Sequence, residues 1–224
     1  MTSFDDAHVI ITGGSEGIGL AIAQSAVERG ARVSLIARRE EPLKSASEGL
    51  AGRSQWAAAD VRDRAEVTAA VDDLVDSFGP CDILVANAGY ALPGRFWELP
   101  EDEVADEMAV NYMGAVNATK AVLPSMRGRR RGHLCFTSST AGLLGIYGYT
   151  AYSPTKFALR GLAESLRSEL RPDGIAVSVI YPPDTDTPGF AKENEHKPVE
   201  TAAISGTIRP KSANEVAISN SQGN

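Results

Sequence analysis

Short apolar runs alternate along this chain with longer segments in which apolar residues recur every three or four positions. The short runs predict strands at residues 8–12, 32–37, 55–61, 82–87, 133–138 and 175–181. The longer segments predict helices at residues 17–29, 41–50, 65–78, 101–126 and 150–170, with Gly30, Gly79 and Gly174 placed where helices end. Because strands alternate with helices, the pattern predicts a Rossmann-type doubly wound α/β fold with a parallel sheet covered on both faces.

The pattern changes after residue 181. The proline-rich stretch at residues 182–189 is followed by a polar segment in which only a short helix at residues 212–218 is expected. Residues 1–190 are therefore expected to form one dinucleotide-binding catalytic domain, and residues 191–224 a lid segment and short tail of the same domain. Residues 208–224 contain no β-branched run, so no further sheet strand is expected there.

Composition is that of an ordinary globular domain, since 43% of the 224 residues are hydrophobic and 23% are charged. A net charge of −7 gives no reason to expect a nucleic-acid partner, and the arginine-rich run at residues 127–131 is interpreted as a solvated loop. Cys81 and Cys135 give neither a disulfide framework nor a metal-ligand spacing. No signal-peptide pattern or membrane-spanning run is present, so a cytoplasmic location is expected.

The turn after the first expected strand reads TGGSEGIG at residues 12–19. It follows an apolar strand and opens an alanine-rich helix, which is where glycines let the backbone approach a pyrophosphate at a helix N-terminus. The alternative is a tight strand-to-helix turn that binds nothing. The cofactor-binding residues expected in this turn are Gly13, Ser15, Glu16, Gly17, Ile18 and Gly19.

The end of the second strand selects between the two nicotinamide dinucleotides. An acid there binds a ribose 2′-hydroxyl, whereas a cation binds a 2′-phosphate. This strand ends at Arg38 and Arg39, so NADPH is favoured, with Arg38 as the phosphate ligand and Arg39 as a helper or a solvated neighbour. Two later strand ends lie at the same edge of the sheet and are expected to approach the adenosine through Asp60, Val61, Asn87, Ala88 and Gly89.

A hydroxyl, a phenol and an ammonium are spaced so that they can converge on one carbonyl oxygen, at Ser139, Tyr152 and Lys156. Tyr152 and Lys156 are four residues apart, so on a helix they share one face. A free tyrosine, with a pKa near ~10, is a poor proton donor at neutral pH, and a nearby ammonium lowers that pKa. The pattern favours a ketone reductase that takes hydride from its cofactor and needs no metal. The alternative is an amphipathic helix with a snorkelling lysine.

Five motifs occur in order along residues 5–190: the glycine turn, NAG at residues 87–89, Asn111, Ser139, and YSPTK at residues 152–156. Together they resemble the short-chain dehydrogenase/reductase family. The resemblance implies that Tyr152 is the general acid, that Lys156 lowers its pKa and holds the nicotinamide ribose, and that Ser139 hydrogen-bonds the substrate oxygen. It also implies that Asn111 holds a water that links Lys156 to solvent. Ser139 is chosen over Ser138 by its distance from Tyr152 and by strand alternation.

A closer resemblance lies in residues 148–153, 157–164, 181–190, 193–194 and 197–198, which are similar to the 3-ketodihydrosphingosine reductases. It implies NADPH-dependent reduction of 3-ketodihydrosphingosine to dihydrosphingosine, a step of sphingolipid biosynthesis. Pro183 stands where most of the family has glycine, and it stiffens the loop expected to cover the nicotinamide. The cofactor contacts expected in this loop are Pro182, Thr185 and Thr187. The eukaryotic relatives are associated with the endoplasmic reticulum, so any membrane contact of this chain is expected to be peripheral.

An amphiphilic substrate needs an apolar slot. Seven apolar residues could line this slot: Phe96, Trp97, Leu143, Leu144, Ile146, Tyr147 and Phe190. The alternative is that they belong to the core or to subunit contacts. Asp184 or Asp186 either meets the substrate ammonium or caps a turn.

Two alternatives stay open. The first is a reductase of the same family that acts on another ketone, such as a 3-oxoacyl thioester or a hydroxysteroid. The second is a cofactor-binding chain without turnover, because the family usually places a seventh strand and its oligomer contacts in the C-terminal region, which is short here. This edge strand is expected to be shortened or lacking, and a homo-oligomer is expected if the C-terminus permits one.

Overall fold

The structure is a computed structural model and describes residues 4–206 and 209–221. A six-stranded parallel sheet with the order β3-β2-β1-β4-β5-β6 forms the centre of this part of the chain. The strands are β1 (His8–Thr12), β2 (Arg32–Ala37), β3 (Ser54–Ala58), β4 (Ile83–Ala86), β5 (Gly132–Thr137) and β6 (Ile175–Ile180). All five residues of β1 are buried, as a middle strand covered on both faces requires.

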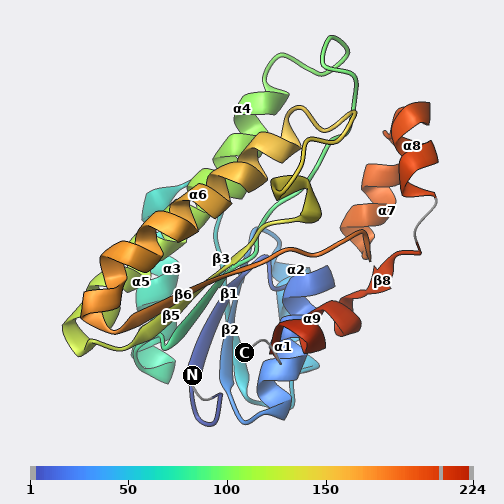
Figure 1. Cartoon of the computed structure of the whole chain (residues 1–224). Helices are drawn as coiled ribbons and strands as arrows, with labels where there is room; N and C mark the ends of the chain where they lie inside the picture. The colour runs from blue at the N-terminus through green and yellow to red at the C-terminus, as the bar shows by residue number, and fades with distance from the viewer. Residues whose placement is uncertain (1–3, 207–208, 222–224) are drawn as a thin grey trace.

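Helices cover both faces of the sheet (Figure 1). On one face, α1 (Gly17–Glu28) and α2 (Glu40–Glu48) pack against β1 and β2 through Ala23 and Leu43. On the other face, α3 (Arg64–Phe78), α5 (Gly114–Arg129) and α6 (Tyr152–Leu170) enclose the larger core, which contains Val67, Val122 and Leu159. The predicted doubly wound α/β fold is therefore confirmed.

The helix predicted at residues 101–126 is divided. It consists of α4 (Glu103–Glu107), one π-helical segment (Met108–Met113) and α5, which continues to Arg129. The arginine-rich run is therefore only partly a loop. Its side chains are held by ion pairs, Arg127 with Asp173 at 2.6 Å and Arg129 with Asp82 at 3.0 Å, and these contacts between distant segments are not visible in a local pattern.

The chain beyond β6 contains more structure than the pattern predicts. A small parallel pair, β7 (Thr185–Asp186) with β8 (Lys211–Ser212), is accompanied by α7 (Pro188–Asn194), α8 (Val199–Ser205) and α9 (Ala213–Ser221). Only the last helix was expected, and it lies beside α1 (Figure 1). Within the described residues the main sheet has no strand beyond β6, as predicted. Residues 222–224 of the polar tail lie outside the described part.

None of the helices in the described ranges is long and apolar enough to cross a membrane.

Candidate active site

Three predicted catalytic side chains meet at the carboxyl end of β5. Ser139 follows this strand and caps a short 3-10 turn, where its Oγ accepts a hydrogen bond from the Ala141 amide at 3.1 Å. Tyr152 is the first residue of α6, and the Ser139 hydroxyl lowers the pKa of its phenol. The Lys156 Nζ lies 5.3 Å from the centre of the Tyr152 ring and donates a hydrogen bond to the Thr137 carbonyl at 3.0 Å. The hydroxyl, the phenol and the ammonium therefore converge as the spacing predicted.

Ser138 faces away from this group. Its buried Oγ donates a hydrogen bond to the backbone carbonyl of Lys156 at 3.0 Å, which fastens the start of α6 to the end of β5. The alternation used to prefer Ser139 therefore places the two hydroxyls in different environments.

Burial is the largest influence on the pKa values of Tyr152 and Lys156. It raises the pKa of the Tyr152 phenol above its ordinary value of 10, while the hydrogen bond with Ser139 lowers it and the carboxyl of Glu193 raises it. Burial also lowers the pKa of Lys156 to about 8, against the carboxyl of Glu107, which raises it. The sequence predicted a Tyr152 pKa lowered by Lys156. The net shift is upward instead, because taking a phenolate out of water disfavours its charge.

Asn111 lies in the π-helical segment, a distortion that is frequent at functional sites. Its amide pairs with both backbone groups of Tyr90 at 2.9 Å and donates to the Thr155 Oγ1 at 3.1 Å. A Cβ on Gly89 would lie 2.9 Å from the Asn111 Oδ1 and 3.3 Å from the Lys156 Nζ. Asn111 therefore joins the loop after β4 to α6 beside Lys156.

The glycine turn has the shape that a pyrophosphate requires. Gly13 and Gly17 have φ values of +66° and +59°, and a Cβ on Gly19 would lie 2.2 Å from the Gly13 carbonyl oxygen. Glu16 is the N-cap residue of α1 but makes no side-chain capping bond, so the first amides of this helix are not capped by it. Ser15 and Ile18 flank the same turn, and the arrangement fits a dinucleotide.

The end of β2 is tied to this turn. Arg39 forms an ion pair with Glu16 at 3.0 Å, whereas Arg38 is exposed directly after Ala37. The charge of Arg38 acts on Asp60, whose pKa is lowered mainly by its hydrogen bonds with Arg62. Arg38 and Asp60 therefore face the same region, as expected for neighbouring strand ends.

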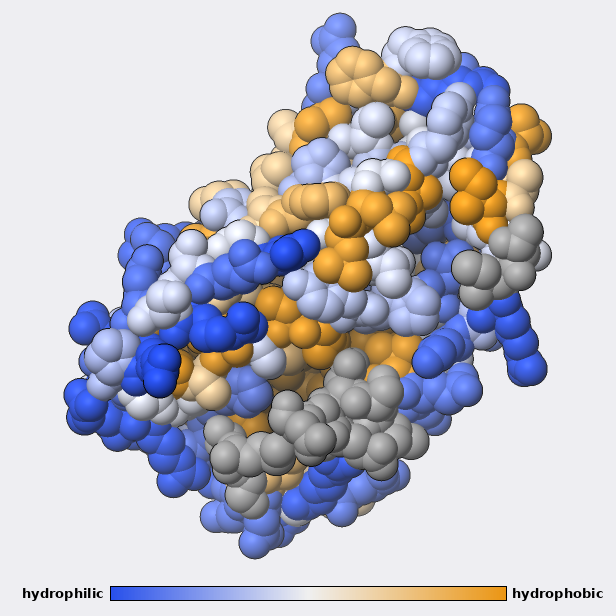
Figure 2. Space-filling view, in the orientation of Figure 1, coloured by the Kyte–Doolittle hydropathy of each residue, from blue (hydrophilic) through white to orange (hydrophobic). Residues whose placement is uncertain are grey.

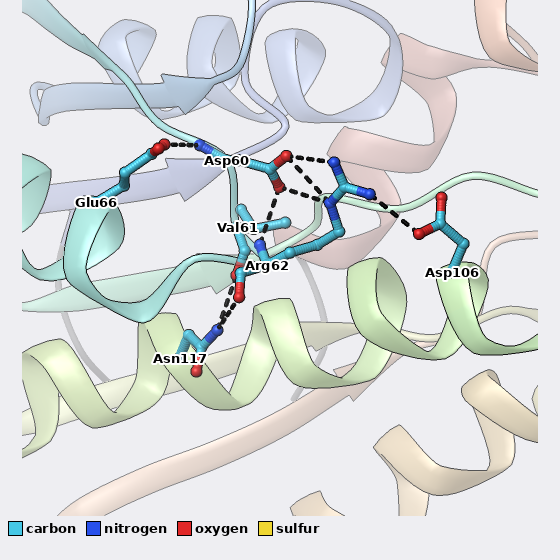
Figure 3. A network of polar contacts seen from close by, with 6 residues as sticks. All are labelled: Asp60, Val61, Arg62, Glu66, Asp106 and Asn117. Carbon is cyan, nitrogen blue, oxygen red and sulfur yellow. Dashed lines mark hydrogen bonds and ion pairs between the residues drawn. The ribbon is translucent and has the colours of Figure 1, made fainter.

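Asp60 and Val61 lie in a loop after β3, which ends at Ala58 and not at residue 61 as predicted (Figure 3). Arg62 binds the Asp60 carboxylate at 2.7 Å and reaches Asp106 on α4 at 3.0 Å. From α5, the Asn117 Nδ2 donates to the Val61 carbonyl at 2.9 Å. The Asp60 carboxylate is thus already paired within the protein.

The next strand end is bound to the glycine turn. The Thr12 Oγ1 accepts hydrogen bonds from the amides of Asn87 and Ala88, both at 3.1 Å. The Asn87 Nδ2 donates to the Gly13 carbonyl at 3.2 Å. These bonds bring residues 87–89 to the same edge of the sheet as the turn.

The loop after β6 reaches both halves of the site. Thr187 caps α7 through the Phe190 amide at 3.1 Å, and its side chain would lie 3.3 Å from a Cβ on Gly17. The Pro182 carbonyl accepts a hydrogen bond from the Thr140 amide at 3.1 Å, beside Ser139. The Thr185 Oγ1 donates to the Pro183 carbonyl at 2.7 Å, so this hydroxyl shapes the loop itself.

Two groups near Tyr152 were missed by the sequence interpretation. On α7, the Glu193 Oε1 accepts a hydrogen bond from the Tyr149 hydroxyl and pairs with the nearly inaccessible Lys197 at 3.2 Å. On α4, Glu107 is fully buried, and its carboxyl raises the pKa of Lys156. Glu107 ends the acidic run EDEVADE at residues 101–107, so nothing local marks it as buried, and nothing local links Glu193 to Tyr149.

Comparison with known proteins shows the family to which this chain belongs. Residues 7–198 match the family model for short chain dehydrogenase. The chain is 45% identical over 222 residues to the 3-dehydrosphinganine reductase of Danio rerio and 44% identical over 219 residues to the 3-ketodihydrosphingosine reductase of Bos taurus. Each alignment covers 94% of this chain and 66% of the relative, so the chain spans just under two thirds of the length of these relatives.

Solved structures agree. Levodione reductase superposes with a TM-score of 0.90 at 26% identity, covering 97% of this chain and 90% of that structure. A short chain dehydrogenase/reductase from Burkholderia phymatum in complex with NAD gives a TM-score of 0.87 at 27% identity, covering 97% and 85%. The predicted family resemblance and fold are confirmed by these matches.

Proposed function

Since this chain belongs to the short-chain dehydrogenase family, we propose that it is an NADPH-dependent reductase that converts 3-ketodihydrosphingosine to dihydrosphingosine. One observation carries the proposal. Ser139, Tyr152 and Lys156 converge at one sheet edge in a chain that is similar, over 94% of its length, to proteins named as reductases of this sphingoid ketone.

The dinucleotide would lie along the carboxyl edge of the sheet. The uncapped start of α1 would take the pyrophosphate, and the exposed Arg38 would take the 2′-phosphate that distinguishes NADPH from NADH. When bound, NADPH supplies the hydride. The other residues assigned to its binding are Gly13, Ser15, Glu16, Gly17, Ile18, Gly19, Arg39, Asp60, Val61, Asn87, Ala88, Gly89, Tyr152, Lys156, Pro182, Thr185 and Thr187.

The protein residues supply the proton and orient the ketone. The Ser139 hydroxyl donates a hydrogen bond to the carbonyl oxygen, and the Tyr152 hydroxyl transfers its proton to the same oxygen as the alkoxide develops. The phenolate left on Tyr152 is stabilised by the Lys156 ammonium. Asn111 keeps the loop at residues 89–92 beside Lys156 and would hold the water that returns a proton to it.

An exposed apolar rim supports an amphiphilic substrate. Phe96 and Trp97 are 66% and 76% exposed. Leu143, Leu144 and Tyr147 are also exposed, and they lie between Ser139 and Tyr152 in the sequence. Hydrophobic residues are exposed across the middle and upper part of this face, whereas hydrophilic residues line its left and lower edges (Figure 2). A long alkyl chain would cover such residues when its polar end enters the site.

The proposal extends to organisation and partners. Residues 1–190 would form the catalytic domain, and residues 191–224 a lid and tail of the same domain. The partners would be the long-chain ketone, a second copy of the chain and, through the apolar rim, the surface of a membrane in contact with the cytoplasm, but no nucleic acid.

The test is NADPH oxidation by the purified protein with 3-ketodihydrosphingosine in detergent. A 3-oxoacyl thioester, NADH in place of NADPH, and a reaction without substrate serve as controls. Consumption selective for the sphingoid ketone and for NADPH is expected. Tight NADPH binding without turnover of any ketone would contradict the proposal, and selective turnover of the thioester would reassign the substrate.

A further inference from the structure

Glu107 is a fully buried carboxyl beneath the active site, at the end of α4. Its Oε1 accepts a hydrogen bond from the Leu92 amide at 2.7 Å, and its Oε2 is a buried atom without a hydrogen-bond partner among the described residues. A buried carboxyl with half of its hydrogen-bonding capacity unfilled destabilises a fold. Such a group calls for a functional explanation.

Glu107 and Asn111 act on the same loop. They lie four residues apart on one continuous helical segment, and the loop at residues 89–92 passes over both. Asn111 pairs with the backbone of Tyr90, and Glu107 accepts from the amide of Leu92. At the other end of this loop, Gly89 lies against Asn111 and the ammonium of Lys156.

The charges around Glu107 come from several elements. Burial raises its pKa to about 8, and Glu103 on α4 and Glu193 on α7 raise it as well, whereas Lys156 on α6 lowers it. The effect is mutual, since burial lowers the pKa of Lys156 to about 8 and the carboxyl of Glu107 raises it. Tyr90 and Tyr152 are also in the field of Glu107, which raises the pKa of each phenol.

We propose that Glu107 is a positioning residue of the active site, which holds the loop at residues 89–92 against Asn111 and, once ionised, keeps the Lys156 ammonium protonated. A negative charge near an ammonium favours its protonated form, so removing that charge lets the ammonium lose its proton at lower pH. The Tyr152 phenolate formed during reduction would then lose its counter-charge. This effect on turnover rests on the function proposed above, whereas the effect on Lys156 belongs to the free chain.

The test is the titration of Lys156 in protein labelled with ¹³C in its lysine side chains, with the signal assigned by Lys156→Arg. Glu107→Gln keeps an oxygen that accepts from the Leu92 amide but removes the charge. Glu103→Gln is the matched control, because Glu103 lies one turn earlier and also has a buried, unpartnered oxygen, but is not among the groups that shift the pKa of Lys156. Glu107→Gln is expected to lower the Lys156 midpoint by about one unit. Glu103→Gln is expected not to lower it, because the charge it removes only disfavours the ionisation of Glu107.

Activity gives a second readout. The alkaline limb of the kcat profile is expected to move to lower pH in Glu107→Gln by the same amount as the Lys156 midpoint. An unchanged midpoint in a folded Glu107→Gln protein would overturn the inference. Absence of turnover on the sphingoid ketone would overturn the proposed function and leave the titration result standing.

If the Glu107→Gln variant does not fold, the same coupling can be measured in the unmodified protein. The Glu107 carboxyl carbon and the Lys156 Cε are followed through the same pH range. Coupled groups respond to each other's titration, so the Lys156 signal is expected to show an inflection where Glu107 ionises. A Lys156 signal without that inflection would contradict the inference.

Discussion

The Nζ of Lys156 lies 5.3 Å from the centre of the Tyr152 ring, yet its hydrogen bond goes to the Thr137 carbonyl and not to the phenol. The lysine is therefore held by the end of β5, and in the proposed reaction its charge would stabilise the Tyr152 phenolate. The Ser139 hydroxyl, in contrast, lowers the pKa of the Tyr152 phenol through hydrogen bonding. This division of roles separates proton donation from charge stabilisation and makes each testable.

Tyr152→Phe is expected to reduce kcat by about 10²–10⁴-fold, because the proton donor is removed while the ring and its packing are kept. The dissociation constant of NADPH, followed by quenching of protein fluorescence, is expected to stay nearly the same. Loss of NADPH binding together with activity would instead show that Tyr152 has a structural role.

Arg38→Ala is expected to raise the dissociation constant of NADPH by about 10- to 100-fold, the value of a charge-assisted hydrogen bond to phosphate. NADH lacks the 2′-phosphate, so its binding is expected to change little. Arg39→Ala is the matched comparison and is expected to have the smaller effect, since its guanidinium is engaged by Glu16. Equal losses for the two dinucleotides in Arg38→Ala would exclude the assignment.

Gly19→Ala is expected to lower the free energy of unfolding by about 1–3 kcal/mol, because its Cβ would lie 2.2 Å from the Gly13 carbonyl oxygen, a backbone atom that cannot move aside easily. Dinucleotide binding should fall with it. Gly128→Ala in α5 is the control, since a Cβ there meets nothing within 4 Å, and it is expected to stabilise by up to about 1 kcal/mol. Denaturant unfolding measures both, and equal stabilities would refute the close contact.

The segment at residues 188–205 is expected to depend on the pair formed by Glu193 and Lys197. The Lys197 side chain is only 2% exposed, so Lys197→Met leaves the largely buried Glu193 without its cation and is expected to weaken the packing of this segment by about 3 kcal/mol. Faster hydrogen exchange at residues 188–205 and a higher KM are the readouts. Adding Glu193→Gln removes the unpaired charge and keeps an acceptor for the Tyr149 hydroxyl, so the double variant should recover. Additive effects of the two changes would show that the pair is not coupled.

The local signals of this chain were sufficient for the fold and for part of the site. Period and turn residues are properties of neighbouring positions, so the strand–helix alternation, the glycine turn and the one-turn spacing of Tyr152 and Lys156 are all readable from the amino-acid order. The same holds for Arg38, which directly follows the end of β2. These features were predicted because each depends on only a few adjacent residues.

The tertiary structure decided what depends on contacts between distant segments. Asn111 contacts Tyr90, 21 residues away, and Thr155, 44 residues away. Glu193 contacts Tyr149, which is also 44 residues away. Helix α9 lies beside α1, at the other end of the chain. The division of residues 101–126 by a π-helical segment belongs to the same class, since it directs Asn111 toward α6. By itself the sequence determined which chemical groups are present and how they are spaced locally. Packing determined which of them are buried together, and burial is what moves the pKa values of Tyr152, Lys156 and Glu107.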